Sequence, residues 1–141
     1  MPTRLSQATI LVVDDEVSLR QVLVRQLRSA GYKVLEAGYG MEALVVARNS
    51  PEPIHLVLSD IRMPGMLGTE LAQRLLAEHP SVRVVLMSAH VLDDLTTVSD
   101  RRGIVQVLYK PFDGQQMLAV VKLVLGTVAA VADPSPAGPD R

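Results

Sequence analysis

Five side chains that could do chemistry stand where short apolar runs of the sequence end. Asp14 and Asp15 follow the first run, Asp60 follows the third, Ser88 the fourth and Lys110 the fifth. Taken one at a time, such residues are more often polar loop residues or helix caps. Four of the five runs end in a carboxylate, a hydroxyl or an ammonium group, and only the second does not. The sequence therefore favours one shared site.

The residue types of this set indicate phosphoryl chemistry assisted by a divalent cation. Three carboxylates in a partly buried cleft repel one another and need a cation to stay ionised. Ligation by oxygen alone favours a hard ion, and few carboxylates in a watery shell suit Mg²⁺. Asp60 stands alone and is the best placed phosphoryl acceptor, whereas the adjacent Asp14 and Asp15 suit metal binding. Lys110 would pair with one phosphoryl oxygen, and Ser88 would donate a hydrogen bond to another.

These side chains need a scaffold in which the ends of the strands meet at one edge. The apolar runs predict buried strands over residues 9–13, 33–37, 55–59, 82–87 and 104–109. Apolar residues at helical spacing predict helices over 17–30, 41–49, 69–78, 93–102 and 115–125, and Gly31 is placed to end the first. This alternation predicts a doubly wound α/β domain, whose ligands bind at the carboxyl ends of a parallel sheet.

Length and composition limit the chain to one domain. The 141 residues carry a formal net charge of -1, from 14 Lys and Arg against 15 Asp and Glu, and contain no cysteine. A disulfide framework and a thiolate metal site are excluded, and the basic excess of a nucleic-acid binder is missing. We expect a cytoplasmic domain over residues 9–125 that binds neither nucleic acid nor membrane, with an N-terminal extension over 1–8 and a disordered tail or linker over 126–141.

Four motifs give the sequence a resemblance to a known family. They are ILVVDDE at 10–16, SDIRMPGMLG at 59–68, MSA at 87–89 and YKPF at 109–112. Together they resemble the receiver domains of two-component response regulators, over about residues 9–125. The resemblance implies a flavodoxin-like (βα)5 three-layer sandwich with a five-stranded parallel sheet in the order 2-1-3-4-5. Gly65 and Gly68 match the turn after the acceptor, where glycine permits unusual backbone angles.

The resemblance implies a role for each acidic residue. Asp60 matches the phosphoacceptor, which takes its phosphoryl group from a sensor histidine kinase, a phosphotransfer protein or a small phosphodonor. Asp15 matches a direct Mg²⁺ ligand, and Asp14 matches a ligand that binds through water. Asp60 and the backbone carbonyl of Arg62 match the remaining ligands. The chain would then be a switch that catalyses only its own phosphorylation and autodephosphorylation.

The resemblance also implies how the phosphoryl group changes the protein. Ser88 matches the switch hydroxyl, and Lys110 matches the lysine before a commonly cis bond, here Lys110–Pro111. Many receivers have an aromatic residue three positions before this lysine, but here that residue is Val107, and Tyr109 stands directly before Lys110. We expect altered coupling, with Tyr109 either taking over part of the aromatic role or presenting a contact surface.

The expected output is a change of protein surface. The fourth helix, fifth strand and fifth helix would form the switching surface, for partner binding or a homodimer. Arg62 and His90 match positions that tune the phosphoryl lifetime, although both also fit solvated surface residues. The chain would be either a stand-alone receiver or part of a longer regulator or hybrid kinase.

Two other classes of protein share this architecture. Phosphatases of the haloacid dehalogenase type also use an aspartate after a parallel strand with Mg²⁺, but they usually have a second aspartate where this chain has Arg62. A flavodoxin-like nucleotide binder needs a phosphate loop rich in Ser, Thr or Gly after the first strand, and Asp14-Asp15-Glu16 has the wrong charge for one. The joint pattern of site residues favours the receiver.

Overall fold

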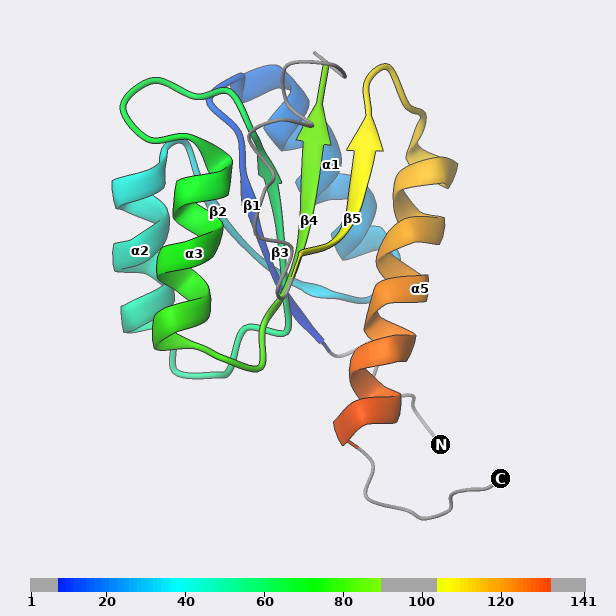
Figure 1. Ribbon diagram of the computed structural model, residues 1–141. Helices are drawn as coiled ribbons and strands as arrows, with labels where there is room; N and C mark the ends of the chain where they lie inside the picture. Colours follow the sequence, from blue (N-terminus) through cyan, green and yellow to red (C-terminus); the bar gives the residue numbers. More distant parts are fainter. Residues whose placement is uncertain (1–7, 90–103, 133–141) are drawn as a thin grey trace.

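Strands and helices alternate along residues 8–89, as the hydrophobic pattern predicts (Figure 1). This computed structural model describes residues 8–89 and 104–132. The strands in these residues are β1 (Thr9–Val13), β2 (Lys33–Ala37), β3 (Leu56–Asp60), β4 (Arg83–Ser88) and β5 (Ile104–Tyr109). The helices are α1 (Val17–Ser29), α2 (Gly40–Asn49), α3 (Gly68–Glu78) and α5 (Gly114–Ala132). The predicted helix over 93–102 and the residue His90 lie outside the described residues.

The five strands form one parallel sheet in the order β2-β1-β3-β4-β5. This order confirms the doubly wound α/β fold. Two strands end later than predicted, because Asp60 still pairs with Met87 and Ser88 still pairs with Tyr109. Asp60 and Ser88 are therefore the last residues of their strands, and the sheet itself fixes their backbones.

Each face of the sheet has its own hydrophobic core. Because successive strand residues point to opposite faces, Leu11 and Val13 belong to the core under α2 and α3, whereas Ile10 and Val12 belong to the core under α1 and α5. All four side chains are fully buried. Burial on both faces explains why β1 reads as a continuous apolar run rather than an alternating one.

Helix α1 ends at a glycine with positive φ, as predicted. Gly31 has a φ of 100°, which glycine adopts without steric cost. The Gly31 N–H donates to the Arg28 carbonyl at 2.9 Å, and the Tyr32 N–H donates to the Leu27 carbonyl at 3.2 Å. These bonds satisfy carbonyls that the end of the helix leaves open.

Helix α5 is longer than predicted. The predicted end at Leu125 is wrong, because the helix continues through Gly126 to Ala132. The added residues are mostly alanine and valine, and a single glycine costs a helix only about 1 kcal/mol relative to alanine. The first residues of the predicted tail are thus helical, while the domain boundary at 125 stays a prediction. Within the described residues, no helix is long and apolar enough to cross a membrane.

Candidate functional site

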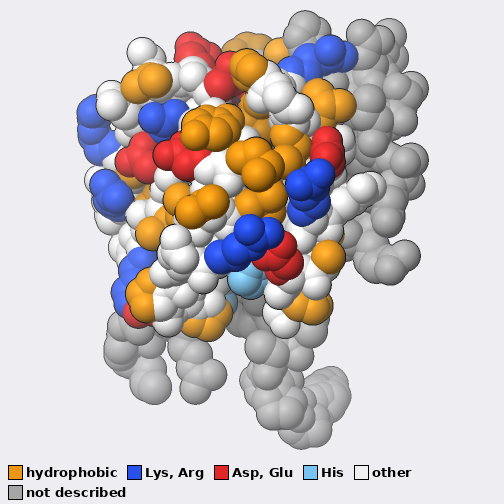
Figure 2. All heavy atoms as spheres, turned by 90° about the vertical axis from the view of Figure 1, so that its left-hand side faces the viewer, with side chains coloured by type: hydrophobic (Ala, Val, Ile, Leu, Met, Phe, Trp, Pro, Cys, Tyr) orange, Lys and Arg blue, Asp and Glu red, His pale blue; other side chains and the backbone are white. Residues whose placement is uncertain are grey.

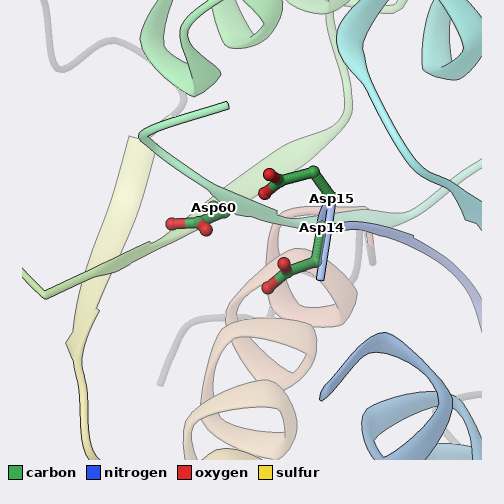
Figure 3. Close-up of side chains that lie close together, drawn as sticks. All are labelled: Asp14, Asp15 and Asp60. Carbon is green, nitrogen blue, oxygen red and sulfur yellow. The ribbon is translucent and has the colours of Figure 1, made fainter. Parts of the chain in front are cut away.

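Three carboxylates meet at the carboxyl edge of the sheet. β1 and β3 are paired in parallel, with Val13 opposite Ser59. The residues that follow these two, Asp14 and Asp60, therefore lie side by side. Asp15 follows in the turn after β1. One oxygen of each carboxylate lies within 4.8 Å of the others (Figure 3). The structure thus brings together the three carboxylates that the sequence analysis grouped.

Two of these carboxylates are withdrawn from water. Asp14 is 0% exposed and Asp60 is 9% exposed, whereas Asp15 is exposed. Burial is the main cause that raises the pKa of Asp14, and the negative charges of Asp60 and Asp15 raise it further. Burial also raises the pKa of Asp60, and the charge of Asp15 adds to this. Ionisation of the whole cluster is therefore costly unless a cation neutralises it.

Lys110 brings a positive charge to the cluster. Its backbone N–H donates to the Ser88 carbonyl at 2.7 Å, where β4 and β5 end. Lys110 Nζ donates to Asp60 Oδ2 at 3.2 Å and lies 3.7 Å from Asp14 Oδ2. Burial has the largest effect on the pKa of both Asp14 and Asp60, and it raises both values. The charge of Lys110 opposes this effect and lowers the pKa of each. The Lys110–Pro111 peptide bond is cis.

A buried oxygen without a hydrogen-bond partner indicates where a cation would bind. Asp14 Oδ1 accepts a hydrogen bond from the Glu16 N–H at 2.8 Å, whereas the buried Oδ2 accepts none within the described part of the chain. Buried polar atoms normally have a partner. Asp15 and Asp60 supply further carboxylate oxygens within 4.8 Å. Because the donor set contains only oxygen, it fits a hard divalent cation such as Mg²⁺.

Ser88 and Arg62 flank the carboxylates. Ser88 is buried at the end of β4, one residue beyond Met87, which is the partner of Asp60 in the sheet register. Arg62 is exposed and lies in the turn two residues after Asp60. The structure places both residues at the edge of the sheet that carries the cluster.

Val107 and Tyr109 belong to the last half of β5. Val107 is partly buried and packs against the core under α2 and α3. Tyr109 is 40% exposed and pairs in register with Ser88. Because the two residues are separated by two positions, they point to the same face of the sheet. The aromatic ring on this face is therefore the one next to Lys110.

The turn between β3 and α3 holds the backbone of Asp60. Gly65 has a φ of 86°, a conformation that other residues rarely adopt. The Gly68 N–H donates to the Ile61 carbonyl at 2.7 Å, and Ser59 Oγ donates to the Asp60 carbonyl at 2.9 Å. A Cβ at Gly68 would overlap the Asp60 carbonyl oxygen. Only glycine therefore fits at the start of α3 with this backbone.

Sequence reasoning missed two features near the site. The first is Arg20 of α1, whose Nη1 donates to the backbone carbonyl of Asp14 at 2.9 Å. In the sequence, Arg20 is one of several polar residues of an amphipathic helix, and its spacing gives no sign of this contact.

The second missed feature is an apolar patch on the α2–α3 side of the molecule (Figure 2). Tyr39, Met41, Val45 and Leu67 are each more than 40% exposed. A pocket of about 290 Å³ lies among residues of α2, α3 and the turns that precede them. Met41 and Val45 are four residues apart, which is the spacing of neighbours on one face of a helix. Apolar residues that face the core have the same spacing, so the sequence could not show that this face of α2 is exposed.

Fold and site together define a class of protein. The chain is a doubly wound α/β domain with an acidic pocket and a lysine at the carboxyl edge of its sheet. Within this class, residues 10–122 match the family model of the response regulator receiver domain. The chain therefore belongs to this family, and the resemblance seen in the sequence is confirmed. The match lends no support to the phosphatase or nucleotide-binder alternatives.

Individual relatives agree with this assignment. The DNA-binding transcriptional regulator NtrC of Escherichia coli K12 is 36% identical over 119 residues, 84% of this chain and 25% of NtrC. The chain thus spans about a quarter of that relative. Sporulation initiation phosphotransferase F of Bacillus subtilis is 33% identical over 117 residues, 82% of this chain and 92% of the relative. The CheY-like receiver domain structure from Methanospirillum hungatei has a TM-score of 0.80 and 26% identity, covering 88% of this chain and 98% of that one.

Proposed function

We propose that this receiver domain is switched by Mg²⁺-dependent phosphorylation of Asp60. Receiver domains act as signalling switches rather than as enzymes with external substrates. One observation carries the proposal. Lys110 Nζ contacts Asp60 Oδ2 at 3.2 Å, beside the buried Asp14 Oδ2, which lacks a hydrogen-bond partner among the described residues.

Asp60 is the phosphoryl acceptor. One oxygen of its carboxylate attacks the phosphorus atom of the donor, an acyl phosphate forms, and the bond from phosphorus to the donor's leaving atom breaks. That atom is a histidine nitrogen of a kinase or phosphotransfer protein, or an oxygen of a small phosphodonor. Lys110 then pairs with one phosphoryl oxygen, and Ser88 donates a hydrogen bond to another. The chain catalyses only this step and its own autodephosphorylation.

The carboxylates of Asp14, Asp15 and Asp60 and the backbone carbonyl of Arg62 are the proposed metal ligands. Mg²⁺ bound there supplies positive charge that stabilises the transferred group. The close approach of the three carboxylates, within 4.8 Å, supports this ligand set. The side chain of Arg62, exposed at the mouth of the site, and His90 are proposed to tune the phosphoryl lifetime.

Partner proteins follow from the same proposal. The phosphodonor is a sensor histidine kinase or a phosphotransfer protein, and the relative from Bacillus subtilis is itself named a phosphotransferase. The switching surface consists of the helix predicted over 93–102 together with β5 and α5. This surface binds a partner or a second copy of the chain.

The central test is the mass of the protein after treatment with acetyl phosphate. We expect wild type with Mg²⁺ to gain one phosphoryl group, and we expect no gain for Asp60→Asn or for wild type with EDTA. Asp113→Asn is the matched control, because Asp113 is an exposed aspartate that binds the Gln116 N–H at the start of α5. Absence of a Mg²⁺-dependent adduct on wild type and on the control would refute the proposal.

A second prediction concerns the coupling to the surface. Because Tyr109 is 40% exposed and adjacent to Lys110, we expect Tyr109→Ala to remove most of the phosphorylation-dependent change in the amide NMR spectrum of α5. We expect Val107→Ala to keep that change, because Val107 packs against the core under α2 and α3 rather than facing the surface of α5. The extent of phosphorylation, measured by mass, should be the same in both variants. The reverse pattern, with only Val107→Ala losing the response, would show that Tyr109 is not the aromatic reporter.

A further inference from the structure

Arg20 of α1 connects the end of β1 with β2. Its side chain is only 17% exposed. Nη1 donates to the Asp14 carbonyl at 2.9 Å, and Nε donates to Glu36 Oε1 at 3.0 Å. Because the guanidinium is planar and rigid, two bonds from the same group fix the Asp14 carbonyl relative to β2.

The carbonyl that Arg20 binds belongs to the peptide unit between Asp14 and Asp15. This unit is planar, so its orientation sets the direction in which the chain leaves Asp14. The Asp14 side chain has a further restraint, the bond from the Glu16 N–H at 2.8 Å. The Asp15 side chain makes no hydrogen bond or ion pair with the residues that the structure describes. The place of the Asp15 carboxylate therefore depends on the backbone that Arg20 holds.

The end of β2 leaves room for the guanidinium. A Cβ at Gly38 would lie 3.0 Å from Arg20 Nη1, closer than an ordinary contact. The Gly38 N–H donates to Glu42 Oε1 at 2.7 Å, which fixes the turn before α2. β2 is the strand that brings no reactive side chain to the edge of the sheet. It contributes instead the acceptor Glu36 and the space at Gly38.

Arg20 acts through position rather than by neutralising the carboxylates. Its charge is paired with Glu36, and its bond to Asp14 is made to the backbone oxygen. Lys110 is the cation that faces the carboxylate oxygens, at 3.2 Å from Asp60 Oδ2 and 3.7 Å from Asp14 Oδ2. Loss of Arg20 would therefore change the geometry of the turn more than the charge of the cluster.

We propose that Arg20 is a positioning residue of the metal pocket, which holds the Asp14–Asp15 turn in the conformation that binds the cation. This inference rests on the proposed function, because it takes the carboxylates as Mg²⁺ ligands. Groups that orient metal ligands typically change metal affinity by about 10–100-fold when they are removed. The same loss of affinity is expected for Arg20→Ala.

The test is a calorimetric titration of Mg²⁺ into the full chain. We expect the dissociation constant to rise by about tenfold or more in Arg20→Ala. Arg20→Lys should recover part of the loss, because an ammonium group can donate to the carbonyl but lacks the planar fork. Arg48→Ala is the matched control, since Arg48 of α2 pairs with Glu78 at 2.8 Å, away from the pocket. The Mg²⁺ dissociation constant of Arg48→Ala should equal that of wild type. All titrations are made at a temperature where circular dichroism shows every variant folded.

A metal-free readout separates this inference from the proposed function. The Glu16 N–H binds Asp14 Oδ1, so its hydrogen exchange should be faster in Arg20→Ala than in Arg48→Ala when EDTA is present. Equal Glu16 exchange in these two variants, or wild-type Mg²⁺ affinity in Arg20→Ala, would overturn the positioning role. If wild type itself binds no Mg²⁺, the proposed function is wrong and the metal role of Arg20 is wrong with it. Faster Glu16 exchange would then still show that Arg20 holds the turn.

Discussion

Without metal at pH 7, Asp14→Asn should raise the free energy of unfolding by about 1–3 kcal/mol, the size of the penalty for an unsatisfied buried polar group. Asp14 is 0% exposed, and within the described residues its Oδ2 accepts no hydrogen bond. Asparagine has nearly the same shape and keeps an oxygen for the Glu16 N–H. It carries no negative charge to repel Asp60, and its amide can donate to the Asp60 carboxylate. The variant also loses the attraction of Lys110, which lies 3.7 Å from Asp14 Oδ2. Burial raises the pKa of Asp14 more than the charge of Lys110 lowers it, so removal of the charge is still stabilising.

The size of this gain depends on pH. Burial, followed by the charges of Asp60 and Asp15, raises the pKa of Asp14 above its ordinary value of 3.8. The folded state therefore binds the proton more tightly than the unfolded state. The stability that protonated Asp14 contributes is fully present below the ordinary pKa and is lost as pH rises through the raised pKa. Since asparagine does not titrate, its advantage should be small near pH 3 and complete above the raised pKa.

Mg²⁺ should reverse the order of stability. A ligand that binds only the folded state at about 1,000 times its dissociation constant stabilises by about 4.1 kcal/mol, which exceeds the metal-free advantage of Asp14→Asn. This gain is expected for wild type but not for Asp14→Asn. Asp15→Asn is the control, because exposed Asp15 has little burial penalty to relieve, so its metal-free gain should be smaller. Urea unfolding followed by circular dichroism measures all three proteins. An Asp14→Asn variant less stable than wild type in EDTA at pH 7 would contradict the account of the buried charge.

The strands and the carboxylate cluster could be predicted because they depend on local pattern and topology. The run over residues 10–13 is apolar at every position, which fits only a strand buried on both faces or a short helix, and the following acidic residues mark its end. Once the strands are parallel, their carboxyl ends share one edge, so Asp14, Asp60 and Lys110 must come near one another. Distances within the cluster were not needed for that conclusion.

The sequence could not predict contacts that depend on how side chains of different helices and strands are oriented toward one another. The bond from Arg20 to Glu36 joins residues 16 positions apart, and nothing in their spacing indicates that they meet. The end of α5 was missed for a different reason. Gly126 is a weak stop signal, and the alanines that follow continue the helix. The predicted ends of β3 and β4 were one residue too early. A polar side chain looks like the start of a turn in the sequence, but the backbones of Asp60 and Ser88 are still paired in the sheet.

Gly68→Ala should lower the free energy of unfolding by about 1–3 kcal/mol, the usual cost of overpacking. Two effects of opposite sign act at this position. Alanine in a helix is favoured over glycine by about 1 kcal/mol. Its Cβ, however, would overlap the Asp60 carbonyl oxygen and lie 3.0 Å from the Asp60 carbonyl carbon and from Ile61 Cα. All three are backbone atoms, which do not move aside as a flexible side chain would, so the clash should outweigh the gain in helix propensity.

The shift forced by this methyl group should also reach the phosphoryl acceptor, because the displaced carbonyl belongs to Asp60 itself. We therefore expect Gly68→Ala to gain phosphate from acetyl phosphate more slowly than wild type, as measured by intact mass under conditions where both are folded. Gly126→Ala is the matched control, because a Cβ there meets no atom within 4 Å and α5 continues on both sides. Only the helix propensity changes in Gly126→Ala. Its free energy of unfolding, measured in urea, should therefore rise by about 0.5–1 kcal/mol, and it should accept phosphate at the wild-type rate. A similar gain in Gly68→Ala would mean that the start of α3 does not press against the backbone of Asp60.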